Sequence, residues 1–378
     1  MARGSVFKRS GGWAFKVDTG FHPESGKRRQ LVKQGFRTKR EAENALTEAR
    51  KSVIDGTVVA NSSMRLDVFL DEWLAAQESR LRASTHHSYV IAAARLKRHL
   101  GAYKVQALTP LQIEAFYAEL LDHGHRNGDG LSAKSVKNTH VVLRKALADA
   151  ERLGLVPRNA AAAARGPTVR RPELSTWSSD QLKSFSKVAQ DSRLRNVFTI
   201  LATTGMRRGE ALGLRWGDID FDSSQIAIVQ TVSTVDGAIV VGQPKTSGSR
   251  RTVYVHDATI RALRQQRQLQ AAERLAAGPV WEADNDLVFR SVTGGPENPD
   301  VVSHRFKQLV AEAGLPRIRL HDLRHTNATL SLKAGVHPKV VSERLGHSTI
   351  AITLDLYSHV TPGISREAAA TVESLMFD

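Results

Sequence analysis

The stretch that decides how the chain is organised lies at residues 321–359. It reads His-Asp-Leu-Arg-His at 321–325, Leu-Gly-His at 345–347 and Leu-Tyr-Ser-His at 356–359. His321 and Arg324 are three residues apart, so on a helix their side chains point to one face. An Arg guanidinium is a planar fork that suits two phosphate oxygens, and an imidazole handles a proton near neutral pH. Together with Tyr357, these groups suit nucleophilic attack on a phosphodiester.

Local signals predict that these residues lie on a series of short helices. The apolar positions of the first helix are Leu320, Leu323, Ala328, Leu330 and Leu332. Pro338 suits the first turn of a second helix, and Gly346 suits its end. His347 is therefore expected just past a helix end, and Tyr357 within the next short helix.

Each of these residues also has a less specific interpretation. His321 and His325 are four residues apart, which is a known spacing of zinc ligands on a helix. The guanidinium of Arg324 opposes a cation there, and no Glu follows His321 as the metalloprotease pattern requires. A His-x-x-Arg pair alone is usually a solvated helix face, and a single Tyr is usually packed. The catalytic interpretation therefore depends on a second, upstream motif.

That upstream motif is Thr-Thr-Gly-Met-Arg-Arg-Gly-Glu-Ala-Leu at 203–212. The residues before it fit the end of a helix, Gly205 permits a sharp turn, and Glu210 opens the next helix. The pattern predicts that Arg207 is held in a tight turn between two packed helices, where it can be directed toward a ligand. Taken alone, it would be a surface Arg in a loop.

The motifs occur in an order that is typical of one family of proteins. Thr-Gly-Met-Arg-x-x-Glu at 204–210 is followed by Lys245 in a polar turn, and then by His-x-x-Arg-His, Leu-Gly-His and Tyr. In that order the motifs resemble the tyrosine recombinase, or phage integrase, family. The resemblance is sharpest over residues 173–361 and extends more weakly over the N-terminal half.

The resemblance implies a role for each matched residue. Tyr357 is the expected nucleophile, giving a 3′-phosphotyrosyl link and a free 5′-hydroxyl. The other catalytic positions are Arg207 and Arg324 as phosphate clamp, Lys245 as proton donor to the leaving oxygen, His321 as base and His347 as hydrogen-bonding partner of the phosphate. Glu210 is expected to brace Arg207, and His325 to be structural. No metal ion or nucleotide cofactor is expected, because two guanidiniums stabilise the charge and the covalent link conserves the bond energy.

Composition narrows the class of protein. The 378 residues include 54 Lys and Arg against 38 Asp and Glu, a net charge of +16, which suggests a polyanion as partner. The length favours two or three domains. The chain has no Cys, which excludes disulfides, Cys–zinc sites and thiol catalysis. No apolar run approaches the length of a membrane span, and we expect the protein to act in the cytoplasm of a bacterial host.

Residues 1–57 predict a small basic module. A Gly-Gly pair separates two short alternating stretches and fits a hairpin turn, and residues 28–36 give a third strand. A capping box at 38–41 opens a helix that runs to about Ile54. A three-stranded sheet with one helix resembles the arm-type DNA-binding module of integrases, and a purely structural cap is the alternative. The candidate DNA contacts are Lys8, Arg9, Lys16, Arg28 and Arg29.

Residues 64–157 predict a four-helix domain. Apolar residues recur at helical spacing, and Ser84, Thr109 and Ser132 are expected to begin helices. Its basic face resembles the core-binding domain of the family. The candidate DNA contacts are Arg95, Lys97, Arg98, Lys134, Lys137, Arg144 and Lys145. Residues 158–172, with an Ala run, Gly and Pro, are expected to form a linker.

Residues 173–378 predict an α+β catalytic domain. Strands are expected at 225–232, 238–243 and 251–255, and helices at 257–276 and 299–313. Lys245 falls in the polar turn between the last two strands. A final amphipathic helix is expected, with apolar positions at Ile364, Ala368, Val372 and Leu375. The family resemblance implies that it docks on a neighbouring protomer, and packing on its own domain is the alternative. The fold class is thus multidomain and mainly α, with small antiparallel β-sheets.

The resulting hypothesis is a site-specific DNA recombinase, an integrase of a phage or mobile element. A type IB topoisomerase-like enzyme is an alternative, because it shares the Tyr-and-Arg chemistry but acts as a monomer. A DNA-binding regulator without chemistry is a second alternative, which the full set of matched residues opposes. The expected partners are double-stranded DNA attachment sites, further copies in a homotetramer on DNA, and accessory DNA-bending and directionality proteins, with no membrane.

Overall fold

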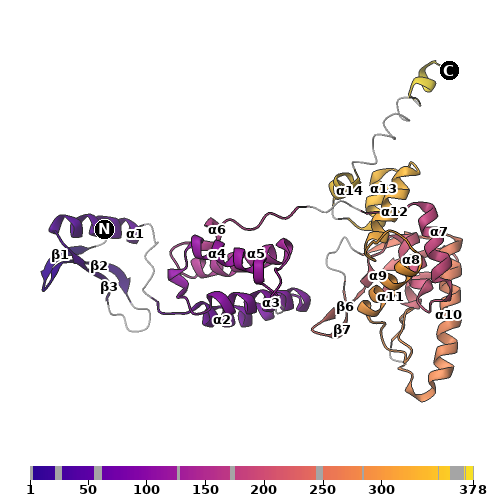
Figure 1. Cartoon of the computed structure of the whole chain (residues 1–378), viewed down its shortest axis with the longest axis horizontal. Coiled ribbons are helices and arrows are strands. Elements are labelled where there is room, and N and C mark those ends of the chain that lie inside the picture. The colour runs from indigo at the N-terminus through magenta and orange to yellow at the C-terminus, as the bar shows by residue number, and fades with distance from the viewer. Residues whose placement is uncertain are drawn as a thin grey trace. The chain divides into compact units, whose positions relative to one another are not determined.

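The computed structural model describes residues 3–21, 28–54, 62–125, 128–170, 175–243, 250–282, 285–347, 349–357, 370 and 372–377. The chain divides into two compact units, Met1–Arg171 and Pro172–Asp378 (Figure 1). Both units are mainly helical, and each also contains short antiparallel strands, which confirms the predicted fold class. In the ranges described, no helix is long and apolar enough to cross a membrane.

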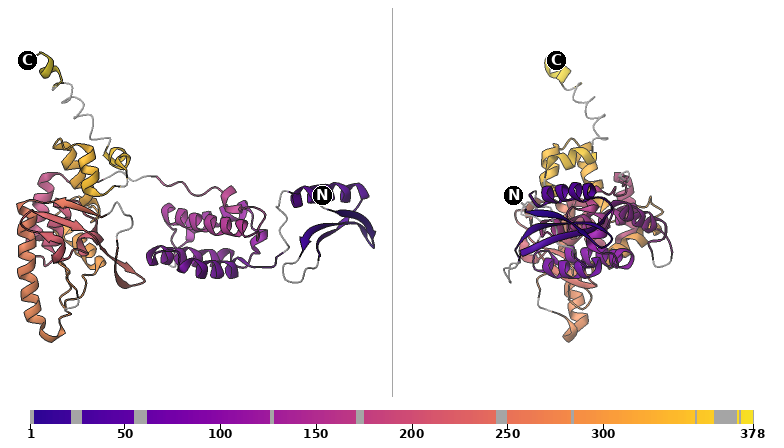
Figure 2. Two further views of the ribbon diagram at one scale, coloured as in Figure 1. Left: turned by 180° about the vertical axis from the view of Figure 1, so that it is seen from behind. Right: turned by 90° about the vertical axis from the view of Figure 1, so that its left-hand side faces the viewer.

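The N-terminal module is a three-stranded antiparallel sheet with α1 lying across one face (Figure 2). Its elements are β1 (Gly4–Arg9), β2 (Gly12–Phe21), β3 (Arg28–Phe36) and α1 (Lys39–Ile54). The hairpin turn needs Gly11 and Gly12 because both have positive φ, which residues with a Cβ rarely adopt. Phe15 and Val17 of β2 are buried together with Leu46 of α1. The alternation and the helix predicted here from the sequence are confirmed.

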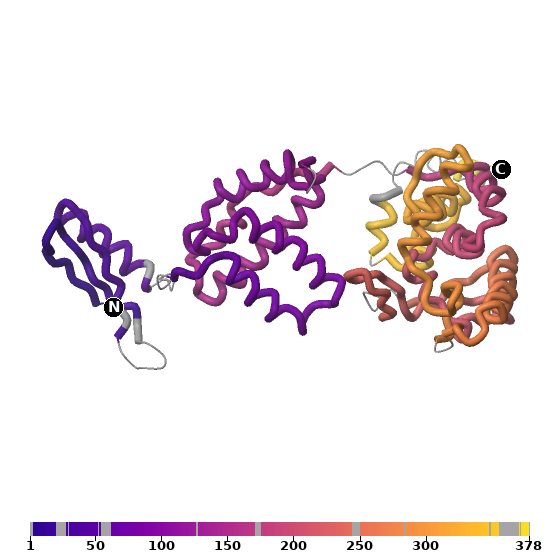
Figure 3. Tube along the Cα trace, turned by 60° about the horizontal axis from the view of Figure 1, so that its bottom comes forward, coloured from indigo at the N-terminus to yellow at the C-terminus, as the bar shows by residue number. Residues whose placement is uncertain are grey.

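Most of the remaining first unit is a helical bundle (Figure 3). Its helices are α2 (Leu66–Glu78), α3 (Ala83–Leu100), the 3-10 turn η1 (Val105–Ala107), α4 (Pro110–His123), α5 (Ala133–Arg152) and the short α6 (Ala160–Ala163). One apolar core joins the α-helices. Thr109 begins α4 with a capping box, and Ser132 caps α5, as predicted. The prediction for Ser84 is wrong: Arg82 is the N-cap residue of α3, and Ser84 already lies in its first turn.

Part of the segment expected as a linker belongs to this bundle. Asn159 caps α6 by accepting from the backbone of Ala162, and its amide donates to the carbonyl of Arg144 on α5. The small side chains of Ala160, Ala161 and Ala164 are buried in the bundle core. Gly166 lies against the ring of His140, where a Cβ would stand 3.0 Å from the nearest ring carbon. This corrects the expected start of the linker at residue 158, because the chain stays packed through Gly166.

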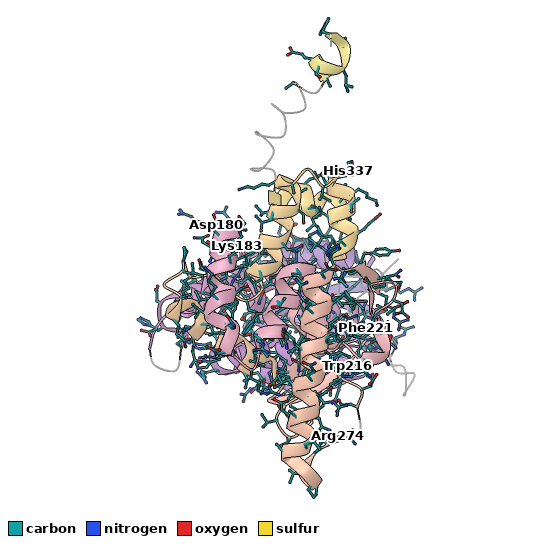
Figure 4. All side chains as sticks on the ribbon, turned by 90° about the vertical axis from the view of Figure 1, so that its right-hand side faces the viewer. Asp180, Lys183, Trp216, Phe221, Arg274 and His337 are labelled. Carbon is teal, nitrogen blue, oxygen red and sulfur yellow. The ribbon has the colours of Figure 1, made fainter. Side chains whose placement is uncertain are left out.

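The second unit is mainly helical. Its α-helices are α7 (Ser179–Val188), α8 (Arg195–Thr204), α9 (Arg208–Leu212), α10 (Asp257–Ala277), α11 (Pro299–Glu312), α12 (Asp322–Lys333), α13 (Pro338–Leu345) and α14 (Ile350–Tyr357). Its 3-10 turns are η2 (Ala189–Asp191), η3 (Trp216–Asp218) and η5 (Gly278–Val280). The helix α7, which a capping box of Ser178 and Gln181 begins, is not among the predicted elements. Trp216 lies beside the long α10 (Figure 4), and its Nε1 donates to Gln270 at 2.7 Å.

The strands of the second unit form two small sheets. They are β4 (Ile219–Asp220), β5 (Gln225–Ile228) and β8 (Arg251–Tyr254) in the order β4-β5-β8, and β6 (Thr231–Val235) paired with β7 (Ala238–Gly242). The single strand expected at 225–232 is therefore wrong. The chain leaves the first sheet after Ile228 and pairs with β7 from Thr231, although the same alternation of buried positions continues through Val232. Lys245 lies outside the described residues, between β7 and β8.

The expected C-terminal amphipathic helix lies mostly outside the described residues. This is so for Ile364 and Ala368, two of its four apolar positions. Residues 372–377 are helical, and Val372 and Leu375 are 53% and 81% exposed. The docking of this segment on a neighbouring protomer stays a prediction.

Candidate active site

Arg207 stands at the turn between α8 and α9. Gly205 reverses the chain at the end of α8 with φ +65°, and Arg207, with extended backbone, is the N-cap residue of α9. The carboxylate of Glu210 accepts from the backbone N–H of Arg207 at 3.0 Å and from its Nη1 at 2.6 Å. The Arg207 side chain is 40% exposed and that of Glu210 only 4%. The guanidinium is therefore held in place and still reaches the surface.

Three side chains from later helices bind the carbonyl groups at the end of α8. Nη1 of Arg324 donates to the carbonyl of Gly205 (2.9 Å), and Nη2 of Arg344 donates to that of Thr203 (3.2 Å). Nδ2 of Asn327 donates to the carbonyls of Ala202 and Thr203 (2.8 and 3.1 Å). The last carbonyls of a helix lack intrahelical partners and carry partial negative charge, so cationic donors stabilise them. The upstream motif and the His-Asp-Leu-Arg-His stretch are brought together in this way.

We expect Gly205→Ala to destabilise the protein by about 2–4 kcal/mol, because it adds a left-handed penalty and a steric clash. A Cβ at this position would stand 2.4 Å from Cδ2 of Leu345 and 3.0 Å from Oδ1 of Asn327. Gly314→Ala is the matched control, since Gly314 has φ +61° and a Cβ there would meet nothing within 4 Å. Urea unfolding of both variants measures the difference. Equal losses would show that the close packing at Gly205 is unimportant.

Residues 322–325 of the His-Asp-Leu-Arg-His stretch are buried in the first turn of α12, whereas His321, the N-cap residue of the helix, is exposed. Arg324 is 3% exposed, and the rings of His321 and His325 meet edge to face with centroids 5.2 Å apart. Partial desolvation of the ring, followed by the charges of the neighbouring His325 and Arg324, lowers the pKa of His321 to about 4. The His321 imidazole is therefore neutral at pH 7 and can accept a proton. Among the residues described, no three His, Asp or Glu side chains form a group that could hold a metal ion.

His347 connects α13 to α14. It follows Gly346, whose φ of +67° ends α13, and its Nδ1 lies 2.8 Å from Oγ1 of Thr353 on α14. Burial, followed by the charges of Arg324 and Arg207, lowers the pKa of His347 to about 4. The ring therefore lies within electrostatic reach of both guanidiniums. Nη2 of Arg207 also donates to the carbonyl of Gly346 at 3.2 Å.

Tyr357 is the last residue of α14, as the sequence predicts for a short helix. Its side chain lies outside what the structure describes. Thr353, which bonds His347, is fully buried and stands four residues before Tyr357, so the two positions share a face of α14. The structure thus gathers Arg207, His321, Arg324 and His347, and puts position 357 on the helix that His347 contacts.

Sequence reasoning misses three residues of this site: Arg251, Asn327 and Arg344. Asn327 follows Arg324 by three residues, so its place on the same helix face is a usable signal. Arg344 directly precedes Leu-Gly-His and donates to the carbonyls of Tyr254 and Thr203. Arg251 is the first residue of β8 and is buried against Glu210. Its position depends on strand pairing, which the local sequence does not reveal.

Strand alternation separates the candidate DNA contacts of the N-terminal module. Lys16 lies between Phe15 and Val17, which face α1, so Lys16 points to the open face of the sheet. The register pairs Ser5 with Lys16, so Arg9, four residues further along β1, shares that face. Nη1 of Arg9 donates to Gln34 at 2.7 Å. Lys8 falls on the other side with Val6, Arg28 is exposed within 4.0 Å of Asp18, and the side chain of Arg29 is outside the described residues.

The candidate contacts of the helical bundle lie on α3 and α5. Contacts that join neighbouring helices are Arg95 to Thr139 (3.5 Å), Lys145 to the Tyr89 hydroxyl (3.3 Å) and Lys97 to Asp71 on α2 (2.6 Å). The exposed members are Arg98, Lys134, Arg144 and Lys145. Burial lowers the pKa of His140, and the positive charges of Lys137 and Arg144 lower it further. Positive charge is therefore concentrated along α5.

The catalytic unit brings together two guanidiniums and two imidazoles, a set of groups that can bind and polarise a phosphate. Residues 176–363 match the phage integrase family, residues 6–53 match an arm DNA-binding domain, and residues 66–121 match the N-terminal SAM-like domain of phage integrases. The chain belongs to the phage integrase family, the tyrosine recombinases. It is a site-specific recombinase of a phage or a mobile element.

Curated relatives align over nearly the whole chain. A "tyrosine recombinase XerC-like" protein of Caldanaerobacter subterraneus is 28% identical over 99% of this chain and 100% of its own length. The ICEBs1 integrase of Bacillus subtilis is 27% identical over 97% of this chain and 98% of its own. Both alignments include the N-terminal module as well as the catalytic unit.

Solved structures show the same fold. The Tn1549 transposon integrase in complex with transposon right end DNA superposes with a TM-score of 0.67 at 20% identity, over 82% of this chain and 99% of that one. A lambda integrase tetramer bound to a Holliday junction gives a TM-score of 0.56 at 20% identity, over 91% of this chain and 95% of that one.

Proposed function

We propose that this integrase cuts and rejoins DNA at attachment sites through a 3′-phosphotyrosyl intermediate on Tyr357. The observation that carries the proposal is the common anchoring of Arg207, Arg324 and His347 at the α8–α9 turn. Arg324 binds the Gly205 carbonyl, and Arg207 binds the Gly346 carbonyl next to His347. Two guanidiniums fixed by the protein need little reorganisation when charge develops on a phosphate.

The proposed cleavage step exchanges one phosphate ester for another. The Tyr357 hydroxyl oxygen forms a bond to phosphorus, and the bond from phosphorus to the 5′-oxygen of the next nucleotide breaks. His321 takes the phenol proton, and Lys245 supplies a proton to the leaving 5′-oxygen. The reverse step, with a 5′-hydroxyl from a second duplex as nucleophile, rejoins the strand. No bond energy is lost between the two steps, so no nucleotide cofactor is required.

The two imidazoles have different proposed tasks. Both are neutral at pH 7, since their pKa values are near 4. An approaching phosphate stabilises the protonated imidazole and raises both pKa values, so the rings become better proton acceptors when DNA binds. His321 then serves as base, and His347, oriented by Thr353, hydrogen-bonds a phosphate oxygen.

Recombination of a supercoiled plasmid that carries paired attachment sites tests the proposal. The protein is incubated with this plasmid in EDTA, and the DNA is separated before and after protease treatment. We expect recombinant circles and a covalent intermediate that forms without divalent metal. Relaxation without recombinants would support the topoisomerase alternative, and binding without covalent complex would support the regulator.

The three parts of the chain have separate proposed tasks in this reaction. Residues 1–57 would bind distal arm sites, residues 64–157 would bind the core site, and residues 173–378 would carry the chemistry, with residues 158–172 between them. Four copies would assemble on two duplexes in the host cytoplasm, with accessory bending and directionality proteins. The support is the match of each part to a separate integrase domain and the basic charge of the first part, 13 basic against 6 acidic residues in 1–60.

Removing residues 1–60 is expected to abolish binding to distal sites and integrative recombination, because it removes about seven net positive charges and the whole sheet. Core-site binding should persist through residues 64–378, which keep their own basic helices. Gel-shift assays with separate arm and core fragments measure both. Unchanged recombination by the truncated protein would refute the arm-binding proposal.

Two double substitutions test whether arm-site binding depends on the open face of the sheet or only on the net charge of the module. Arg9→Ala with Lys16→Ala removes two charges from the face opposite α1 and should weaken arm-site binding. Arg40→Ala with Lys51→Ala removes the same charge from exposed positions of α1 and is the matched control. Equal weakening by the two pairs would show that only net charge matters.

A further inference from the structure

One buried guanidinium contacts several parts of the proposed site at once. The side chain of Arg251, at the start of β8, is 8% exposed. Its Nη2 donates to Oε2 of Glu210 at 2.9 Å, and its Nε donates to the carbonyl of Arg344 at 2.8 Å. It thus joins the first turn of α9 to the end of α13, two segments far apart in the sequence.

The carboxylate of Glu210 is shared between two guanidiniums. One oxygen accepts from Nη1 of Arg207, and the other accepts from the backbone of Arg207 and from Arg251. Burial alone would raise the pKa of Glu210, but the hydrogen bond and charge of Arg251, followed by those of Arg207, hold it below its usual range. Without Arg251, Glu210 would lose the partner that contributes most to keeping it ionised.

Arg251 also supports the turn that carries His347. The Cα of Gly346 lies directly against the guanidinium, since a Cβ there would stand 2.9 Å from Nη1 and 3.1 Å from Cζ. A longer or shorter side chain at position 251 would shift this turn or leave it unsupported. The carbonyl of Gly346 binds Arg207, and His347 is the next residue, so such a shift reaches both proposed phosphate ligands.

We propose that Arg251 is a positioning residue for DNA cleavage, which acts through Glu210 on Arg207 and through Gly346 on His347. It fixes both groups relative to each other by joining the first turn of α9 to the end of α13. The inference rests on the proposed catalytic roles of Arg207 and His347. It assigns Arg251 no contact with the DNA itself.

The test compares Arg251→Met and Arg251→Lys with Arg193→Met in the full-length protein. Arg193 is a matched control, since it is a partly buried Arg of the same unit whose guanidinium binds Glu273 and Glu297 in a structural network. Core-site affinity, thermal unfolding and the single-turnover rate of covalent complex formation on a nicked core site are measured for each. We expect Arg251→Met to slow cleavage about 10²-fold at unchanged affinity, the effect of a small misplacement of catalytic groups. Arg193→Met should lose stability but cleave within about threefold of wild type while it stays folded.

A pH series separates positioning from general destabilisation. In Arg251→Met, buried Glu210 keeps only Arg207 as cationic partner, so its pKa rises and cleavage should fall as the pH is lowered through that raised value. The wild type should show only the loss that comes from protonation of the base His321, without the additional limb due to Glu210. Arg251→Lys keeps the charge and should restore the wild-type pH profile while the rate stays intermediate, because one hydrogen bond is still missing. Arg251→Met combined with Glu210→Gln should lack this additional limb and keep only the one due to His321.

Two results would count against the assignment. Cleavage by Arg251→Met that falls no further than that of Arg193→Met would overturn it, and so would an unchanged pH profile. Absence of covalent complex with the wild-type protein on the nicked core site would instead refute the proposed function, which keeps the two failures distinguishable.

Discussion

Tyr357→Phe is expected to abolish the covalent protein–DNA complex while core-site binding changes by less than about twofold. The variant loses one hydroxyl from an interface whose affinity comes mainly from phosphate contacts. DNA cleavage stops because the phenyl ring has no hydroxyl oxygen to form the bond to phosphorus. The geometric support is indirect but specific: position 357 shares a face of α14 with Thr353, and Thr353 bonds His347.

A nicked core site measures this result, because cleavage beside the nick releases a short fragment and traps the covalent complex. Tyr254→Phe is the matched control, since Tyr254 lies on β8 of the same unit with 66% of its surface exposed. The control should trap as much DNA as the wild type. Covalent complex trapped by the Tyr357→Phe variant would assign the nucleophile to another residue.

The sequence predicts the elements whose boundaries have local chemistry. Gly205 and Gly346 are expected at sharp turns, and both adopt left-handed backbone at the ends of α8 and α13. The Thr109 cap and the Gly-Gly hairpin also depend only on neighbouring residues. Such features can be predicted from the sequence because the turn or cap forms with the same neighbouring residues whatever the rest of the fold is.

Features that depend on distant partners are missed or misplaced. The strand expected at 225–232 splits because β5 pairs with β8 while β6 pairs with β7, and the alternation of Ile226, Ile228 and Val232 continues across the break. The Ala run at 160–164 has the composition of a tether, yet its small side chains are what let α6 pack closely. Local composition cannot distinguish the two outcomes.

The candidate site shows the same division. The motif residues can be named because their spacing is local to each motif. Arg251 and Arg344 cannot, because their importance comes from Glu210 and from the end of α8, to which they are joined only in the folded chain. Asn327 has only its spacing from Arg324 as a signal, and its bonds to the end of α8 form in the folded chain. The expectation that Glu210 braces Arg207 holds in the geometry, but nothing in the local sequence indicates that the same carboxylate also binds Arg251.

Arg207→Lys and Arg324→Lys are each expected to slow cleavage by about 10²–10³-fold, the cost of removing one donor to a developing oxyanion. Both changes keep the charge and lose the planar fork. Arg324 uses Nη1 on the Gly205 carbonyl, so a Lys ammonium would have to choose between that carbonyl and the phosphate. Arg207 has the same conflict, because it binds both Glu210 and the Gly346 carbonyl.

Arg208→Lys is the control for these two variants. Arg208 is the neighbour of Arg207, and its Nη1 alone makes the bonds to the Pro299 carbonyl, Asp300 and Ser303. A single ammonium can replace that nitrogen, so cleavage should stay within about threefold of wild type. Core-site affinity and its salt dependence are measured alongside the cleavage rate, and a lost phosphate contact would reduce the slope of log affinity against log salt by about one. If affinity and cleavage fell in parallel for Arg207→Lys and Arg324→Lys, both residues would be ordinary phosphate contacts, and the clamp would have to be assigned elsewhere.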